Sequence, residues 1–209
     1  DCPRQLRYER LMLRHLVERS DDFVGAFRKL PRKLQELFPQ AYQSYLFNRF
    51  LSKRIENGIS LCSVEVGDFV VGVERSGLPN VEMSKIANSG TVKEVNSAVR
   101  AGRMQLALPL VGFRHGLSEG KQGEIERQVL EEERVSAEGF RLKTLPELGL
   151  RGALRSTVTP LNNFSLDASN SLCKQTCEAK VSFNLSRGSY ATVVLRELMK
   201  PHNLITAGF

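Results

Sequence analysis

The sequence predicts an α+β protein in two parts: an α/β part over residues 1–155, and a smaller part of strands and a helix over residues 156–209. Apolar residues recur at helical spacing as far as Asn57. After Gly58, short extended segments alternate with helical ones. From Cys177 to Leu185, apolar and polar residues alternate strictly, which is the pattern of a strand with one face on a core.

The first predicted helix spans residues 4–19. Arg7, Arg10 and Arg14 follow one another at three- and four-residue spacing, so their guanidinium groups share one side of the helix. This row is either a stripe that contacts phosphates or a solvated face with ordinary surface charge. The sequence leaves the two interpretations equal.

Two further helices and a short one are expected before residue 58. The segment Ser20-Asp21-Asp22 can serve as a stop and as the N-cap of the short helix. Pro31 suits the first turn of the next helix, with Leu34, Leu37 and Phe38 on its buried side. A separate and longer helix runs from Gln40 to Asn57, where an Asn-Gly pair is a good stop signal.

The longest predicted helix carries both aromatic and basic side chains. Tyr42 and Tyr45 are expected in the core, because aromatic residues at this spacing are more often packed than free to stack on bases. Arg49 and Lys53 are four residues apart and share a face, with Arg54 beside them. This helix therefore presents a cluster of positive charge.

The middle of the chain predicts a hairpin, a helix and a strand. The hairpin pairs Val64–Val66 with Phe69–Val73 around a Gly67-Asp68 turn. The helix over residues 91–102 begins with a capping box and ends at a glycine. The strand spans Met104–Leu110.

Two polar segments follow that strand. Residues 114–123 are Gly-rich and are expected to form a mobile loop. Residues 124–134 are rich in charge and are expected to form a solvated surface helix. Their acidic triplet, Glu131 to Glu133, does not suit a metal ion, because adjacent helical positions point in different directions.

The C-terminal part is expected to be extended from Gly152. A connection rich in Asn and Ser, over residues 162–171, leads to a strand, a turn and a helix over residues 177–200. Arg187-Gly188 ends the strand, and Ser189 is a suitable N-cap for the helix.

Tyr190 is expected in the first turn of that helix. Backbone N–H groups at a helix start lack intrahelical partners and favour anions, and Arg187 lies close by in sequence. An aromatic ring beside such a site offers a stacking surface for an unpaired nucleobase. The alternative is a packed tyrosine in an ordinary strand–helix junction, which geometry alone favours.

The net charge of +7 is concentrated at the two ends of the chain. Residues 1–58 hold 12 Lys/Arg and 7 Asp/Glu, residues 59–150 hold 11 and 13, and residues 151–209 hold 7 and 3. A polyanion that contacts both ends would suit this distribution. A modest excess of positive charge also occurs on proteins with no nucleic-acid role.

The sequence indicates no metal or organic cofactor. Cys173 and Cys177 lack the second ligand pair that zinc requires, and His15, His115 and His202 are far apart in sequence. Phosphate-binding glycine loops and hydrolase motifs are absent from the sequence. Scattered cysteines and the lack of a long apolar run predict a reduced, cytoplasmic setting and no membrane partner.

Two segments are similar to a known family. Residues 187–200, RGSYATVVLRELMK, resemble the C-terminal signature of the TruD family of tRNA pseudouridine synthases. Residues 40–61, QAYQSYLFNRFLSKRIENGISL, resemble the family's other well-marked segment in this half. Weaker matches follow the family's order along nearly the whole chain, at Gly67-Asp68, LPLVGF (108–113), EGF (138–140) and RGALR (151–155).

The resemblance implies a reaction and a domain arrangement. The family converts a uridine in tRNA, at position thirteen, to pseudouridine without a metal or organic cofactor. Residues 1–155 would belong mainly to the C-terminal part of an inserted domain. Residues 156–209 would be the C-terminal part of a split catalytic domain with a mixed, mainly antiparallel sheet. Taking a base out of its stack is costly, and Tyr190 matches the family's aromatic position that stacks on the target uracil.

The resemblance also suggests supporting residues. Gly188 and Ser189 would set the backbone that presents the ring, while Arg187 and Arg196 are candidates for phosphate or active-site electrostatics. The candidates for RNA contact are Arg49, Lys53, Arg54 and Arg155.

The family's catalytic motif is missing from this sequence. Its nucleophilic aspartate lies in a Gly-x-Lys-Asp motif, followed by a Phe-Gly-x-Gln-Arg-Phe-Gly motif, and neither occurs here. We therefore expect the C-terminal half of a longer enzyme, with the missing N-terminal half of the catalytic domain as its partner and no activity alone. The alternatives are a non-catalytic RNA-binding module and a purely structural fragment.

Overall fold

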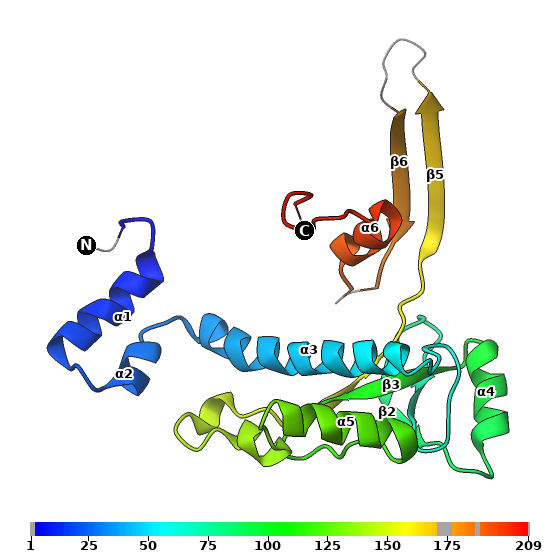
Figure 1. Cartoon of the computed structure of the whole chain (residues 1–209), viewed down its shortest axis with the longest axis horizontal. Helices are drawn as coiled ribbons and strands as arrows, with labels where there is room; N and C mark the ends of the chain where they lie inside the picture. The colour runs from blue at the N-terminus through cyan, green and yellow to red at the C-terminus, as the bar shows by residue number, and fades with distance from the viewer. Residues whose placement is uncertain (1–2, 171–176, 187–188, 209) are drawn as a thin grey trace. The chain divides into compact units, whose positions relative to one another are not determined.

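The computed structural model describes residues 3–170, 177–186 and 189–208. The chain divides into two compact units, Asp1–Thr157 and Val158–Phe209. This division lies two residues beyond the predicted end of the first part. Both units combine helices with antiparallel strands, so the α+β prediction is confirmed (Figure 1).

The first unit holds a four-stranded antiparallel sheet and the longer helices. Its helices are α1 (Arg7–Glu18), α2 (Phe23–Phe27), α3 (Arg32–Glu56), α4 (Val92–Arg100) and α5 (Gly120–Glu132), with 3₁₀ turns η1 (Ala137–Arg141) and η2 (Pro146–Leu148). Its strands are β1 (Phe69–Val73), β2 (Pro79–Ile86), β3 (Met104–Leu110) and β4 (Ala153–Ser156), in the order β2-β1-β3-β4. Within the described ranges, no helix has the length and apolarity needed to cross a membrane.

Helices cover one face of this sheet. Phe50 of α3, Val129 of α5 and Leu108 of β3 share one buried cluster. Val95 of α4 packs with Leu106 in a second cluster. Because residues two apart on a strand share a face, Leu106 and Leu108 place both clusters on the same side of the sheet. Full burial of each such side chain stabilises the fold by about 1.5–3 kcal/mol.

Helix α3 corrects the prediction of two separate helices. It continues through Pro39, and Leu37 and Phe38 are each 54% exposed rather than buried. Further along, Ile55 is exposed and Phe47 takes a place in the core. A proline costs a helix one backbone hydrogen bond, and we attribute the continuity of α3 to the packing of its second half on the sheet and α5.

The predicted hairpin between residues 64–66 and 69–73 is wrong. Strand β1 pairs instead with β2 and β3. The Asp68 carboxylate accepts a hydrogen bond from the Glu65 N–H at 2.8 Å, and Asn96 accepts one from the Val64 N–H at 2.9 Å. Side chains thus satisfy backbone groups that a partner strand would have taken.

Helix α4 and strand β3 confirm two predictions, and the capping box is corrected. The side chain of Thr91 does not cap α4. Asn88 Oδ1 accepts the N–H groups of Gly90 and Thr91, both at 3.0 Å. Gly102 follows the helix with a φ of +69°, a conformation that suits glycine.

Helix α5 corrects both predictions for its region. It begins at Gly120, inside the segment expected to be a mobile loop. Ile125, Val129 and Leu130 are buried, and Glu126 is 0% exposed, so α5 is a core helix and not a solvated one. The high charge of its sequence obscured this apolar side.

The second unit consists of β5 (Asn162–Asn170), β6 (Cys177–Asn184) and α6 (Ala191–Met199). Residues 162–170, expected as a connection, form a strand antiparallel to β6, and Ser171 lies outside the described residues. Phe183 is half-buried and Ser182 exposed, as the alternating pattern predicts. No side chain described in this unit, over residues 158–167, 179–186 and 189–208, is fully buried.

Candidate functional site

Tyr190 precedes the first residue of α6. Its backbone is extended, with φ −110° and ψ 115°, and its side chain is 71% exposed. Ser189 does not act as the predicted N-cap, because Tyr190 occupies that position and no side chain caps α6. The backbone N–H of Ser189 donates to the carbonyl of Ser186 at 3.1 Å. The helix therefore begins one residue later than expected, and the phenol ring faces solvent.

The other candidates near Tyr190 in the sequence are Arg187, Gly188 and Arg196. Arg187 and Gly188 lie outside the described residues. Among the described residues, the one ion pair of Arg196, on α6, is a long one with Glu197, at 3.9 Å, and its side chain is 42% exposed. Its guanidinium group is therefore largely open to an anionic ligand.

Arg49 and Lys53 of α3 both have carboxylate partners. Arg49 forms ion pairs with Glu132 and Glu133, and the Tyr45 hydroxyl donates to Glu133 at 2.8 Å. Lys53 pairs with Glu56 at 3.4 Å. Glutamates from α5 and α3 thus offset the charge of Arg49 and Lys53, two of the residues that the sequence assigned to RNA contact.

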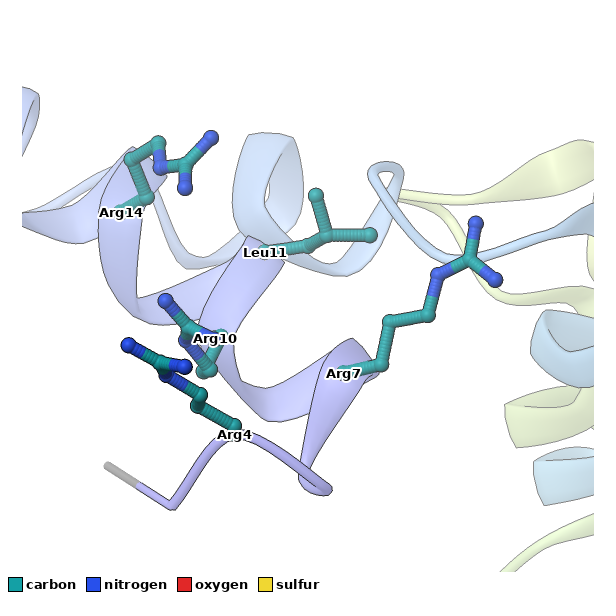
Figure 2. A pocket seen from close by; sticks show the side chains of 5 residues that line it. All are labelled: Arg4, Arg7, Arg10, Leu11 and Arg14. Carbon is teal, nitrogen blue, oxygen red and sulfur yellow. The ribbon is translucent and has the colours of Figure 1, made fainter.

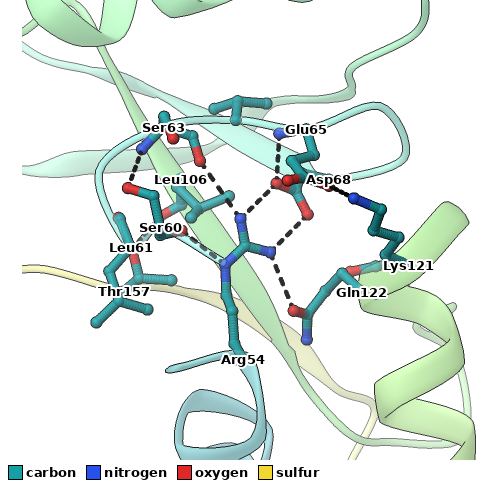
Figure 3. A network of polar contacts seen from close by, with 12 residues as sticks. Arg54, Ser60, Leu61, Ser63, Glu65, Asp68, Leu106, Lys121, Gln122 and Thr157 are labelled. Atoms are coloured by element: carbon teal, nitrogen blue, oxygen red, sulfur yellow. Dashed lines mark hydrogen bonds and ion pairs between the residues drawn. The ribbon is translucent and has the colours of Figure 1, made fainter. Parts of the chain in front are cut away.

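The expected RNA contact at Arg54 is corrected by the structure. Arg54 is 0% exposed, and two of its nitrogens donate to the two carboxylate oxygens of Asp68, each at 2.8 Å (Figure 3). It also donates to the carbonyls of Ser60 and Ser63, at 2.8 and 3.3 Å. The side chain is committed to the interior and cannot reach a ligand on the surface.

A buried polar chain continues from Arg54 into α5. Arg54 donates to Gln122 at 3.0 Å, and Gln122 donates to Glu126 at 3.0 Å. The backbone N–H and hydroxyl of Ser118 also donate to Glu126, at 2.7 and 2.8 Å. Burial raises the pKa of Glu126 to about 7, outweighing these hydrogen bonds, which favour the carboxylate.

Sequence reasoning missed this network. Gln122 and Glu126 stand four residues apart, which is visible in the sequence, but nothing local shows that this face is buried. The polar groups of this network are hydrogen-bonded to one another and enclosed, so the network stabilises the fold and does not bind a ligand.

Arg155 stays on the surface of the first unit. Its guanidinium carbon lies 5.1 Å from the centre of the Phe47 ring, a cation–π arrangement that leaves the charge accessible. Over the described ranges, no group of three or more His, Cys, Asp or Glu side chains is arranged to hold a metal ion.

Comparison with known proteins decides the family. The family model described as tRNA pseudouridine synthase D (TruD) matches residues 1–198. The chain belongs to the TruD family. The resemblance inferred from residues 40–61 and 187–200 is thereby confirmed.

Individual TruD relatives agree along almost the whole chain. A Methanosarcina acetivorans protein named "Probable tRNA pseudouridine synthase D" is 38% identical over 198 residues, covering 95% of this chain and 45% of that protein. One of the same name from Thermococcus sibiricus is 38% identical over 203 residues, covering 97% and 46%. The chain thus spans less than half the length of these relatives.

A solved structure agrees with the fold. A crystal structure of a Methanosarcina mazei protein assigned to tRNA pseudouridine synthase D (TruD) superposes with a TM-score of 0.88 at 37% sequence identity. The match covers 95% of this chain and 46% of that one. The α+β arrangement is therefore shared with the TruD family.

Proposed function

We propose that this chain forms part of a cytoplasmic tRNA pseudouridine synthase that isomerises the uridine at position thirteen of tRNA. The family match over residues 1–198 carries this proposal. The reaction breaks the C–N glycosidic bond of the uridine and forms a C–C bond to the same base, so atoms balance without a second substrate. The residues named below would bind or position the RNA, and the proposed reaction uses no cofactor.

Tyr190 would stack on the extruded uracil. A base that leaves its helix loses its stacking partners, and a protein ring can replace them. Stacking of a base on an aromatic side chain contributes about 1–3 kcal/mol. The 71% exposure of Tyr190 supports this role, because a ring packed in the core could not accept a base.

Neighbouring residues would support the ring and the phosphates. Ser189 holds the backbone before Tyr190 through its bond to Ser186, and Arg196 offers a largely unneutralised charge. Arg155 is the accessible RNA-contact candidate of the first unit. Arg49 and Lys53 would contribute less, since their charges already face carboxylates; the pairs are with Glu132, Glu133 and Glu56.

The two units would correspond to two domains of the family. Residues 1–157 would be an inserted domain, and residues 158–209 the C-terminal part of a split catalytic domain. The second unit supports this, because its described residues form only a two-stranded sheet and none of its described side chains is fully buried. Such a hairpin is marginally stable alone and needs further strands, which the N-terminal half of the catalytic domain would provide.

We also propose that the 209-residue chain has no synthase activity by itself. Neither the Gly-x-Lys-Asp motif nor the Phe-Gly-x-Gln-Arg-Phe-Gly motif occurs in its sequence. Without a nucleophile, a base could be bound but its glycosidic bond could not be broken.

A turnover assay tests the proposed function. Pseudouridine is measured in an unmodified tRNA transcript after incubation with the 209-residue protein or with a longer protein that carries the upstream coding sequence. We expect product from the longer protein only, and none when position thirteen of the transcript is cytidine. Product from the 209-residue protein would refute the placement of the nucleophile, and no product from either would refute the synthase activity.

A further inference from the structure

Four arginines surround a shallow hollow at the start of the chain. Arg4 lies in the turn before α1, and Arg7, Arg10 and Arg14 lie on α1 itself. Together with Leu11 they line a hollow of about 160 Å³ (Figure 2). All four arginine side chains are exposed. We call these four residues the α1 arginine cluster.

The positive charge of the cluster is not neutralised within the described part of the chain. No ion pair or carboxylate hydrogen bond involves any of its four residues there, whereas Arg32 and Arg49 each face a glutamate. Glu9 of α1 lies on the opposite side of the helix, at about 100° per residue. Glu18 lies one turn beyond Arg14 at the edge of the cluster.

Like charges this close repel one another. We expect this repulsion to weaken α1, because no ion pair among the described residues offsets it. A ligand with several negative charges would relieve this repulsion.

Helix α1 is held so that the cluster stays free. His15 Nε2 lies 2.9 Å from Asp22 Oδ2, and Asp22 also accepts the Gly25 N–H at 2.7 Å as the N-cap of α2. The hydrogen bond with His15 is the main cause that lowers the pKa of Asp22, and the hydrogen bond from Gly25 is the second. His15 projects about 100° away from Arg14 around the helix, so the tie to α2 does not cover the arginines.

We propose that the α1 arginine cluster binds the phosphate backbone of the RNA substrate. The choice of RNA as the polyanion rests on the proposed function. Arginines donate from a planar fork that matches phosphate oxygens. The residues from Arg7 to Arg14 cover roughly 10 Å of helix, at about 1.5 Å per residue, which is enough to face more than one phosphate.

The composition of the hollow favours RNA over a membrane surface. A helix that lies in a lipid headgroup layer does so through a broad apolar face. The hollow has no such face, although Leu13 and Val17 are exposed on another side of α1, which is why vesicles are included as a probe below. Leu11 is the one apolar residue that lines the hollow, and it is 37% exposed between the arginines. Four donors around one small apolar contact suit a charged chain better than acyl groups.

Binding titrations at several salt concentrations test this proposal. The 209-residue protein is compared with R4Q/R7Q/R10Q/R14Q and with a control, R75Q/R100Q/R103Q/R127Q, which removes the same charge from exposed arginines outside α1. The ligand is an unmodified tRNA transcript, and anionic phospholipid vesicles serve as a second probe. Circular dichroism verifies that both variants fold.

The cluster variant should bind the transcript at least tenfold more weakly near physiological salt. Its log–log salt slope should fall by about 3, because each lost phosphate contact removes about 0.7–0.9 from the slope. The control variant should lose less than threefold. Equal losses in the two variants, no loss in either, or vesicle binding without RNA binding would overturn the proposal.

Turnover by the longer protein separates this proposal from the proposed function. In that protein the cluster substitutions should raise KM and leave kcat at saturating RNA within about threefold. An unchanged KM would overturn the cluster's role while product formation continued. No product from the protein with its arginines intact would instead refute the synthase activity.

Discussion

Arg54 and Asp68 form a two-point ion pair in the interior of the first unit. Nη1 lies 2.8 Å from one carboxylate oxygen and Nη2 lies 2.8 Å from the other, with the side chains 0% and 1% exposed. The pair joins the end of α3 to the loop before β1, and Gln122 extends it to α5 (Figure 3). Three segments distant in sequence are thus fixed at one point.

Removing one partner of this pair should strongly destabilise the protein. Arg54→Met leaves the Asp68 carboxylate buried without a counter-charge, which typically costs about 3–5 kcal/mol of unfolding free energy. Urea denaturation measures the change. Lys53→Met is the matched control, because its pair with Glu56 is on the surface and should contribute less than about 1 kcal/mol. A loss below about 1 kcal/mol for Arg54→Met would show that the pair is not important for stability.

Glu126 should make the protein less stable as the pH rises from about 5 to about 8. Its pKa is about 7 in the folded protein and near the usual 4.5 when unfolded. The folded state therefore holds an extra proton in this window, and unfolding free energy falls as that proton is lost. Burial is the main cause, and the charge of Asp68 acts in the same direction.

The substitution Glu126→Gln should remove that pH dependence. At about 1.4 kcal/mol per pKa unit, the native protein should lose up to about 3 kcal/mol more than the variant between pH 5 and pH 8. Urea denaturation of both proteins at the two pH values gives this difference. The contributions of the other titrating groups are the same in both proteins and cancel in the comparison. Identical losses in the two proteins would contradict the raised pKa.

Gly67 should tolerate no side chain. Its φ is +97°, and a Cβ there would lie 2.4 Å from the backbone carbonyl carbon of Glu119. Gly77 has a similar φ of +81°, but a Cβ at that position would meet no atom within 4 Å. Gly77→Ala should therefore cost about 1–2 kcal/mol from backbone strain alone. Gly67→Ala should cost at least about 2 kcal/mol more, measured by the same denaturation; equal costs would mean that the Glu119 backbone moves freely.

Tyr190 should affect catalysis through its ring and not through its hydroxyl. In the longer protein, Tyr190→Ala should lower kcat/KM by roughly 5- to 150-fold, which corresponds to about 1–3 kcal/mol of stacking. Tyr190→Phe should stay within about threefold. Because the side chain is 71% exposed, neither change should alter folding by more than about 0.5 kcal/mol. Equal loss in both variants would contradict the stacking role.

Local sequence signals predicted the elements whose own residues carry a clear period. The helix at Val92–Arg100 and the strand at Met104–Leu110 follow their residue patterns, and so does the half-buried alternation of β6. The partners of the strands, in contrast, could not be predicted from local sequence. The partners of β1 are Pro79–Ile86 and Met104–Leu110, and nothing in residues 64–73 specifies them.

For the candidate site, local sequence likewise did not predict which basic residues are exposed. Arg49, Lys53 and Arg54 look alike in sequence, yet the structure pairs the first two with glutamates near the surface and buries the third against Asp68. Burial depends on which element covers a residue. That information is non-local.

The sequence by itself determined the family, the α+β class and the aromatic residue at the start of the last helix. Each of these follows from contiguous residues, either as a sequence motif or as a regular spacing of apolar residues. Only the tertiary structure decided that α5 is a core helix, that Arg54 is internal and that the α1 arginine cluster has no carboxylate partner among the described residues. These properties arise when segments distant in sequence meet, because burial and charge pairing depend on neighbours in space.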